Sequence, residues 1–294
     1  MIKGIIFDLD GTLADTMNDL QTAMNSMLSH LGYSERSRTD LLMAINNGAK
    51  EFVRRSLPKD VQNVDFILQS AIKEYEKQYG ICYLDKTAPY EGIEAMLMNL
   101  RQKNIKLAVL SNKQDKFVKD IVGKLFDKKT FFMIQGQEKS PLKPNPSATL
   151  AIAKKMGVKP SQCLFVGDSD VDMKTAINAD MRSVGVCWGY RGQEILENAG
   201  ATFLIKKPED LCEIVDHLKD ENPKSKLKKD KNFIENTTEN CEFYNRKLLG
   251  TGEFSIVKGL TGETNTKSLS TTGEHSTKIK KDTKSTLAKK KNKK

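Results

Sequence analysis

Cysteine, histidine and tryptophan are scarce in this chain of 294 residues, which contains five, three and one of them. No two cysteines have the Cys-x-x-Cys spacing of a zinc or redox site, and most lie in apolar stretches. We therefore expect buried, reduced thiols rather than a disulfide framework or a zinc site. The three histidines are scattered, which does not support a histidine-based metal centre.

Long apolar runs are also missing, and the N-terminus does not have the pattern of a secretory signal. We therefore expect a cytoplasmic protein with no membrane contact. A chain of this length can form one core domain together with a smaller second one.

The positive charge of the chain is unevenly distributed. Residues 1–218 contain 29 basic and 28 acidic residues, whereas residues 219–294 contain 19 and 10. The net charge of +10 therefore belongs almost entirely to the lysine-rich tail. The polar composition of residues 219–294 predicts a largely disordered segment. We favour the interpretation that the tail is simply solvated. The alternative that its charge leaves open is that the tail binds RNA or an acidic partner.

One segment of the tail, residues 248–258, resembles the glycine-rich phosphate loop of protein kinases, with Ser255 at the position of the third glycine. Neither the catalytic-loop motif nor the magnesium-binding motif of a kinase follows it. We therefore interpret the segment as a fragment and expect no kinase activity.

Apolar runs and helical periodicity alternate through most of residues 1–218, which predicts an α/β fold with a parallel sheet. The expected strands are 4–7, 105–110, 131–134, 163–167, 182–186 and 201–205. The expected helices outside residues 15–88 are 93–103, 115–125, 147–156 and 209–218. Residues 15–88 interrupt the alternation, since they predict the helices 17–31, 41–57 and 66–79 and no clear strand.

Two acidic residues, Asp8 and Asp10, follow the first predicted strand directly, and Gly11 and Thr12 come next. Ligands bind at the carboxyl ends of strands in open α/β sheets. Two carboxylates this close repel each other unless a cation lies between them, and a hard cation such as Mg²⁺ prefers an oxygen-only ligand set. The alternative, that the acids only cap the strand, is less favoured for a pair followed by Gly-Thr.

Polar residues also follow later strands. Ser111 and Asn112 could bind a phosphoryl group or cap the next helix. Two prolines beside Lys143 restrain its loop, which would hold the ammonium in place for binding. The alternative is an ordinary solvated surface charge, which is the usual role of a lone lysine. Asp168 and Asp172 are four residues apart, which suits either one functional helix face or an acidic helix N-terminus.

Taken in this order, the motifs at residues 8–12, 111–112, 143–146 and 168–172 resemble those of the haloacid dehalogenase-like hydrolases. The resemblance covers residues 1 to about 218 and is strongest to the phosphoglycolate phosphatase branch. It implies a Rossmann-like parallel sheet core with an inserted helical cap domain. The predicted domains are a core of 1–14 and 89–218, a cap of 15–88, and the basic tail of 219–294.

The resemblance also implies roles for individual residues. Asp8 would be the nucleophile that forms an aspartyl-phosphate, and Asp10 would be the general acid and base. Mg²⁺ would be held by the Asp8 carboxylate, the Asp10 backbone carbonyl and Asp168, with Asp172 as a partner of these ligands. The predicted phosphate-binding residues are Thr12, Ser111, Asn112 and Lys143.

The predicted function is the Mg²⁺-dependent hydrolysis of a small phosphate monoester, with 2-phosphoglycolate as the preferred substrate. Pyrophosphate, a nucleotide, a sugar phosphate and a sugar phosphate mutase reaction on the same core remain alternatives. The second acid, Asp10, argues against a dehalogenase. One departure from the family pattern is Asp180, which stands where a helix-ending glycine is usual.

Overall fold

The computed structural model describes residues 1–138 and 140–219. Its strands are β1 (Gly4–Phe7), β2 (Ala14–Asp15), β3 (Ala88–Pro89), β4 (Lys106–Gln114), β5 (Met133–Gln137), β6 (Cys163–Gly167), β7 (Arg182–Val186) and β8 (Phe203–Ile205). Six of them form one sheet in the order β5-β4-β1-β6-β7-β8, with every neighbouring pair parallel. Counted along the chain, this is the Rossmann strand order, so the predicted fold class is confirmed.

The helices of the sheet region are α5 (Ile93–Gln102), α6 (Asp115–Leu125), α7 (Ser147–Met156), α8 (Asp170–Asn178), α9 (Gln193–Asn198) and α10 (Asp210–His217), with a short 3₁₀ turn at Pro160–Gln162. Most predicted elements appear within a few residues of their expected bounds. The largest differences are at β4, which ends at Gln114 instead of residue 110, and at β5, which runs over Met133–Gln137 instead of 131–134. Helix α9 was not expected.

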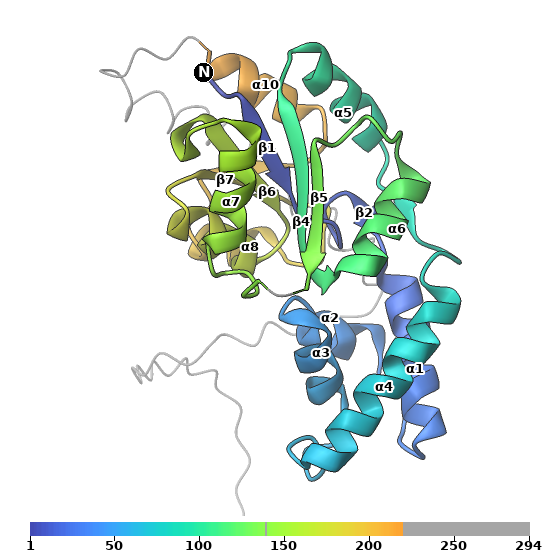
Figure 1. Cartoon of the computed structure of the whole chain (residues 1–294). Coiled ribbons are helices and arrows are strands. Elements are labelled where there is room, and N and C mark those ends of the chain that lie inside the picture. The colour runs from blue at the N-terminus through green and yellow to red at the C-terminus, as the bar shows by residue number, and fades with distance from the viewer. Residues whose placement is uncertain (139, 220–294) are drawn as a thin grey trace, which may run out of the picture. The chain divides into compact units, whose positions relative to one another are not determined.

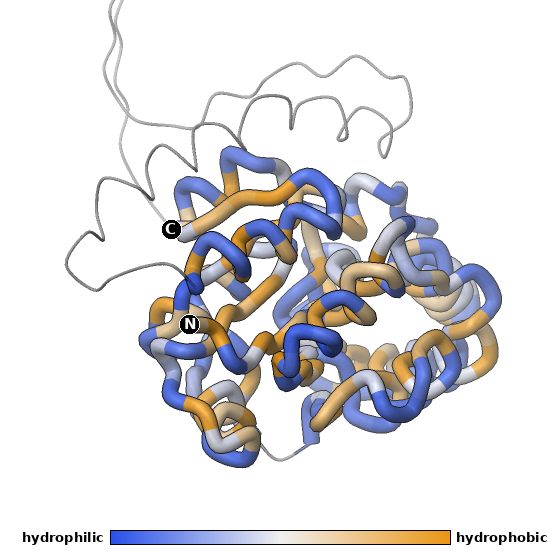
Figure 2. The backbone as a smooth tube through the Cα atoms, turned by 90° about the horizontal axis from the view of Figure 1, so that it is seen from above, coloured by the Kyte–Doolittle hydropathy of each residue, from blue (hydrophilic) through white to orange (hydrophobic). Residues whose placement is uncertain are grey.

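The side chains of β1 are buried on both faces of the sheet. Ile5 and Phe7 pack in the larger core with residues of α5, α6 and α10, whereas Ile6 packs in a second core with residues of α7 and α8. This alternation is what a period of two predicts for a central strand. The result is a three-layer arrangement (Figure 1), with hydrophobic stretches inside and hydrophilic ones mostly outside (Figure 2).

Four helices separate the first strand from the rest of the sheet: α1 (Met17–His30), α2 (Arg38–Ala44), α3 (Gly48–Ser56) and α4 (Asp65–Cys82). They form a separate group at one end of the sheet domain (Figure 1). The single helix predicted for 41–57 is wrong, because the chain breaks between α2 and α3, where Asn46 has φ +92°. The Arg191 guanidinium donates hydrogen bonds to the carbonyls of Leu42 and Ile45 and so stabilises the break.

The expectation of no strand in residues 15–88 is also corrected. The two-residue strands β2 and β3 pair antiparallel, with Ala14 opposite Pro89 and Asp15 opposite Ala88. The pairing ties together the two chain segments that lead into and out of the helical group. It lies where the sequence predicts the domain boundaries, which themselves stay a prediction.

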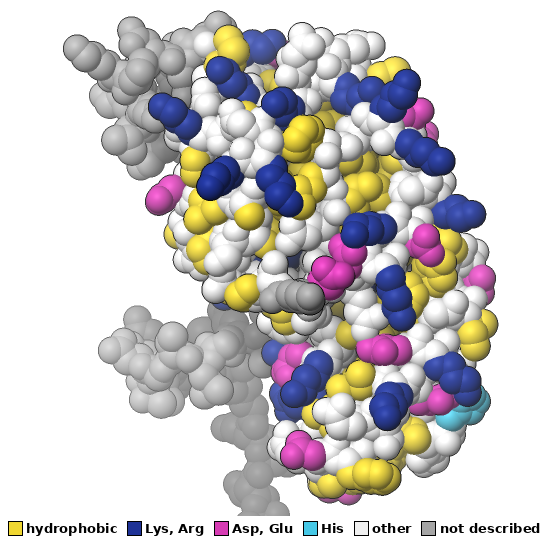
Figure 3. Space-filling view, viewed as in Figure 1, with side chains coloured by type: hydrophobic (Ala, Val, Ile, Leu, Met, Phe, Trp, Pro, Cys, Tyr) yellow, Lys and Arg dark blue, Asp and Glu magenta, His cyan; other side chains and the backbone are white. Residues whose placement is uncertain are grey.

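Within the described part of the chain, no helix combines the length and the apolar character needed to span a bilayer. On the face shown in Figure 3, Lys and Arg side chains predominate over the sheet domain, whereas basic and acidic side chains are mixed over the helical group. Cys82, Cys163 and Cys187 are buried and free of disulfides, and Cys212 is half-buried. The predicted disorder of 219–294 and the kinase-like segment 248–258 lie outside the described residues, apart from Lys219.

Candidate active site

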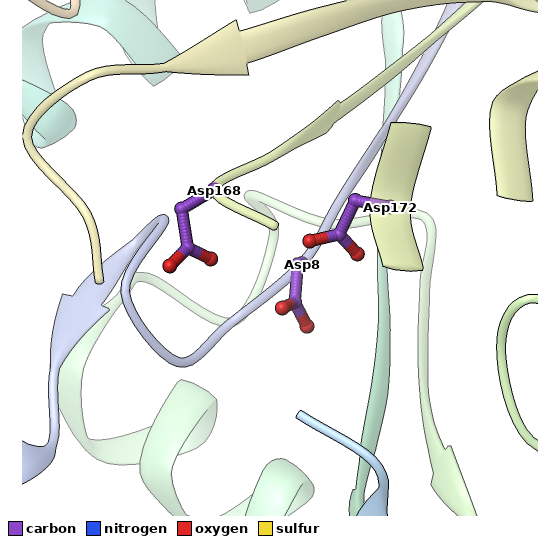
Figure 4. Close-up of side chains that lie close together, drawn as sticks. All are labelled: Asp8, Asp168 and Asp172. Atoms are coloured by element: carbon purple, nitrogen blue, oxygen red, sulfur yellow. The ribbon is translucent and has the colours of Figure 1, made fainter. Parts of the chain in front are cut away.

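Three carboxylates meet at the carboxyl end of the sheet. Asp8 follows β1, Asp168 follows β6, and Asp172 lies in the first turn of α8. One oxygen from each of the three lies within 4.8 Å of the others (Figure 4). Because β1 and β6 are neighbours in a parallel sheet, residues that are 160 positions apart in the sequence end at the same edge.

Lys143 lies between two of these acids. Its ammonium is 2.9 Å from Asp8 Oδ1 and donates a hydrogen bond of 2.6 Å to Asp172 Oδ1. The contact with Asp8 is an ion pair, since that oxygen accepts no well-directed hydrogen bond. Burial acts to lower the pKa of Lys143, but the attraction of Asp172 and Asp8 outweighs it and the pKa is raised. The lysine therefore stays charged at the centre of the site.

The single positive charge of Lys143 cannot neutralise three buried carboxylates. Burial raises the pKa of Asp8 to about 7, although Lys143 opposes the shift. Burial and the nearby Asp172 also raise the pKa of Asp168 well above its usual range. Clustered carboxylates with an oxygen that lacks a directed hydrogen bond suit a hard divalent cation, whose charge would offset their repulsion. Asp8, Asp168 and Asp172 are thus the residues that could hold a metal.

The turn after β1 approaches Asp168 closely. Gly11 has φ +81°, and a Cβ atom there would lie 2.4 Å from Asp168 Oδ2, so only glycine fits. Thr12 donates a hydrogen bond of 3.1 Å from its hydroxyl to Asp168 Oδ1. The Tyr190 backbone N–H donates to Asp168 Oδ2 at 2.8 Å, and Trp188 Nε1 donates to the Thr12 carbonyl at 3.0 Å. The loop after β7 therefore braces this turn.

Asp10 has partners of its own on both sides. Its Oδ1 accepts a hydrogen bond of 2.5 Å from the Thr16 hydroxyl and lies 2.6 Å from the Lys113 ammonium. Thr16 in turn meets the Tyr190 hydroxyl, which accepts a hydrogen bond from the Thr16 backbone N–H at 3.0 Å. The predicted site did not include Lys113, Thr16 or Tyr190. The sequence carried a signal for Lys113, which directly follows Asn112 at a strand end, and for Tyr190, which ends a Trp188-Gly189-Tyr190 segment that resembles a loop of the phosphoglycolate phosphatase branch.

Ser111 and Asn112 lie near the end of β4 and are almost completely buried. The Asn112 amide donates to the carbonyls of Asn46 and Lys143, and its oxygen accepts from the Lys143 N–H at 2.8 Å. In this structure the side chain therefore joins the Lys143 loop to the helical group. The Ser111 hydroxyl accepts a weak bond of 3.2 Å from the Lys113 N–H.

These residues surround a cavity of about 60 Å³ between the sheet and the helical group. Five of the predicted site residues line it: Asp8, Asp10, Ser111, Asn112 and Lys143. Thr12, Asp168 and Asp172 do not line it, but Asp172 accepts a hydrogen bond from Lys143, and Thr12 bonds Asp168. All eight predicted residues are therefore at one end of the sheet, and their roles in catalysis and binding stay predictions.

The helical group supplies the opposite wall of the cavity. Its contribution is mostly apolar or aromatic and includes Phe52 of α3 and Tyr75 and Tyr79 of α4. The first residues of α3, Gly48 and Ala49, also line the wall. In sequence, the segment Asn47-Gly48-Ala49-Lys50 resembles the glycine-containing cap segment of phosphoglycolate phosphatases, whereas the aromatic residues of α4 indicate only one face of a helix.

A family model described as "Haloacid dehalogenase-like hydrolase" matches residues 5–186 of the chain. Among curated proteins, the phosphoglycolate phosphatase of Pseudomonas putida is 33% identical over 205 residues, which cover 68% of this chain and 75% of the relative. Phosphoglycolate phosphatase 1 of Pseudomonas aeruginosa is 32% identical over 217 residues, with coverages of 72% and 79%.

Solved structures are similar over the same region. The crystal structure of a predicted phosphoglycolate phosphatase from Haemophilus somnus has a TM-score of 0.68 and 26% sequence identity. The alignment covers 73% of this chain and 98% of that one. The similarity therefore spans nearly the whole of that protein and leaves about a quarter of this chain without a counterpart.

Proposed function

This chain belongs to the haloacid dehalogenase-like hydrolases, and we propose that it is a phosphatase that hydrolyses a small phosphate monoester with the help of Mg²⁺. The curated relatives named above carry the name of a phosphoglycolate phosphatase, and on that basis 2-phosphoglycolate is the proposed substrate.

The observation that carries the proposal is the position of Asp8. Its carboxylate lines the cavity, where Lys143 lies 2.9 Å away and the second acid Asp10 also contributes to the wall. A carboxylate held in an enclosed site beside a fixed positive charge is suited to attack a phosphorus atom. Asp8 would form an aspartyl-phosphate, and water would then hydrolyse it.

Proton transfer in both steps is assigned to Asp10. It would first protonate the ester oxygen as the alcohol leaves, and then accept a proton from the attacking water. Lys143 and Ser111 would stabilise the charge on the transferring phosphoryl group through fixed donors. Mg²⁺, for which Asp8, Asp168 and the backbone carbonyl of Asp10 are the proposed ligands, would supply charge neutralisation.

Residues 15–88 are proposed to act as a cap that closes over the core and excludes water, as their position over the cavity suggests. The β2–β3 pairing is the proposed junction about which the cap moves. A cytoplasmic location is proposed as well, because a chain with several free buried thiols is suited to a reducing compartment.

Phosphate release from a panel of substrates tests the proposal. The panel contains 2-phosphoglycolate, pyrophosphate, a nucleoside monophosphate and a hexose phosphate, each with Mg²⁺ and with excess EDTA. We expect release that depends on Mg²⁺ and is fastest with 2-phosphoglycolate. No release from any ester would contradict a phosphatase, and exchange of phosphate between two sugar positions without release would indicate a mutase.

A further inference from the structure

The cavity contains several hydrogen-bond donors with no acceptor. Asn46 Nδ2 and the Tyr79 hydroxyl are fully buried, and neither has a partner among the described residues. Both residues line the cavity. Tyr79 as a whole is only 2% exposed. A buried donor without an acceptor is destabilising, and a ligand with acceptor atoms would remove that cost.

Tyr75 adds a further donor to the same wall. Its side chain is 4% exposed, lines the cavity and stacks on the Tyr79 ring with the ring centres 5.8 Å apart. Lys113 and Asp10 are among the groups whose charges act on the pKa of Tyr75, so the phenol lies near that ion pair. Burial, the largest cause, raises the pKa of Tyr75 well above its usual range, which keeps the hydroxyl protonated and able to donate.

Lys113 brings the positive charge. Its side chain is 7% exposed, its Nζ atom lies 4.9 Å from the centre of the Tyr79 ring, and Asp10 is its ion-pair partner in the described chain. An ammonium has three N–H donors, and Asp10 Oδ1 uses one of them. Lys143 is different, because its charge is shared between Asp8 and Asp172. Lys113 therefore has donors left for a ligand.

We propose that Asn46, Tyr75, Tyr79 and Lys113, here called the donor cluster, bind the carboxylate of a substrate that carries it one carbon away from the phosphate ester oxygen. This inference rests on the proposed phosphatase function and names the residues that select the organic half of the substrate. Tyr75 and Tyr79 come from α4, and Asn46 comes from the α2–α3 break, so most of the selectivity belongs to the helical group.

Distance supports a short spacing between the two anionic groups. Asp10 would contact the ester oxygen directly, and Lys113 Nζ is only 2.6 Å from Asp10 Oδ1. If the ester oxygen contacts Asp10 and the carboxylate contacts Lys113, the two groups of the substrate must therefore lie within a few bond lengths of each other. A glycolate ester satisfies this condition, whereas a sugar ring would project into the apolar wall formed by residues such as Phe52 and Phe117.

The acidic residue of the cap wall does not oppose this assignment. Glu76 lines the cavity, but its Oε1 accepts a hydrogen bond from the Gln114 amide of β4. This contact engages the carboxylate of Glu76 and links α4 to the end of the strand. The buried, unpartnered polar atoms on the cap side, Asn46 Nδ2 and the Tyr79 hydroxyl, can both donate, which favours a ligand group rich in acceptor oxygens, such as a carboxylate.

The test compares 2-phosphoglycolate with ethyl phosphate, in which a methyl group replaces the carboxylate. For each enzyme we use the selectivity ratio, kcat/KM for 2-phosphoglycolate divided by kcat/KM for ethyl phosphate. Because Lys113 contacts Asp10, the variant Lys113→Met will slow both reactions, but the ratio separates loss of binding from loss of proton transfer. We expect the ratio to fall about 10- to 100-fold, the usual worth of a charged hydrogen bond.

Two tyrosine variants and a matched control refine the test. Tyr75→Phe and Tyr79→Phe each remove one hydroxyl, and each should lower the ratio about 3- to 10-fold. Tyr83→Phe makes the same chemical change at the end of α4, where the hydroxyl donates to the exposed Asp120 outside the cavity. That control should leave the ratio unchanged.

Different results point to different failures. If Lys113→Met lowers kcat/KM equally for both esters, or if the selectivity ratio of the parent enzyme is close to one, the donor cluster does not bind a carboxylate. The inference is then overturned, while the phosphatase proposal stands. If the parent enzyme hydrolyses neither ester nor any other in the panel, the proposed function fails and this inference fails with it. A fall in the ratio with Lys113→Met but not with Tyr83→Phe supports the donor cluster.

Discussion

At the scale of single residues, the site combines groups that do chemistry with groups that hold them in place. Asp8 and Asp10 are adjacent to the cavity, while Lys143 and Lys113 each hold one of them through an ion pair. The two acids therefore face different partners although they are only two residues apart. This difference in surroundings suits the proposed roles of Asp8 as nucleophile and Asp10 as acid.

Asp8→Asn tests the nucleophile. An amide cannot form the aspartyl-phosphate, so we expect kcat to fall about a thousandfold or more while the fold is retained. Phosphate release by the purified variant and its circular dichroism spectrum check the result. Activity close to that of the parent enzyme would rule out the covalent route.

Asp10→Asn tests the general acid. The variant should lose about a hundred- to ten-thousandfold in rate with alkyl phosphates. Esters with good leaving groups need little protonation, so 4-nitrophenyl phosphate should be much less affected. Rates measured over a series of leaving-group pKa values check this. An equal loss for activated and alkyl esters would remove Asp10 from the acid role.

At the scale of elements, strand ends and helix ends carry the site, and one helix end departs from the usual residue. Helix α8 begins with a capping box in which Ser169 and Asp172 bond each other's backbone. It ends next to Asp180, which has φ +53° and is exposed. An L-residue in this conformation is strained, and an acid at a helix C-terminus also opposes the helix dipole.

Asp180→Gly should therefore stabilise the protein by a few tenths to about 1 kcal/mol, with activity unchanged. Asp180→Asn is the matched variant that removes the charge but keeps a side chain, and it should gain only part of this amount. Urea unfolding midpoints measure both. Destabilisation by glycine would mean that the Asp180 side chain makes a favourable contact that outweighs its strain.

At the scale of the whole molecule, the proposed catalytic residues lie within 8–172, and α10 is the last helix of the described sheet domain. Leu218, which follows this helix, is 2% exposed and belongs to the larger core. Asp216 also pairs with Lys103 at the end of α5, at 2.5 Å. The described region therefore ends with its own packed helix, and the excess positive charge follows it in the sequence.

A chain truncated after Lys219 should keep its phosphatase activity within a small factor of the full-length value. Its charge is nearly balanced, and every residue of the site and of the donor cluster is retained. Kinetics of both forms, with and without ATP, test this expectation. Loss of most of the activity on truncation, or an ATP effect seen only with the full chain, would give residues 220–294 a regulatory role.

The sequence by itself determined the parallel sheet and the end of it that carries the site. Buried strands of a parallel sheet are continuous apolar runs, so β1, β6 and β7 could be predicted with their bounds. Since parallel strands end at one edge, Asp8 and Asp168 could also be expected to meet there. Both inferences need only local patterns and one general rule of topology.

Tertiary structure decided the features that depend on contacts between distant segments. The helical period continues through residues 41–57, and the break appears where Arg191 of a distant loop binds the carbonyls of Leu42 and Ile45. Likewise, the pairing of Lys113 with Asp10 joins the ends of two strands through side chains. Such contacts leave no periodic signal in the sequence, because their energy comes from groups that only the folded chain brings together.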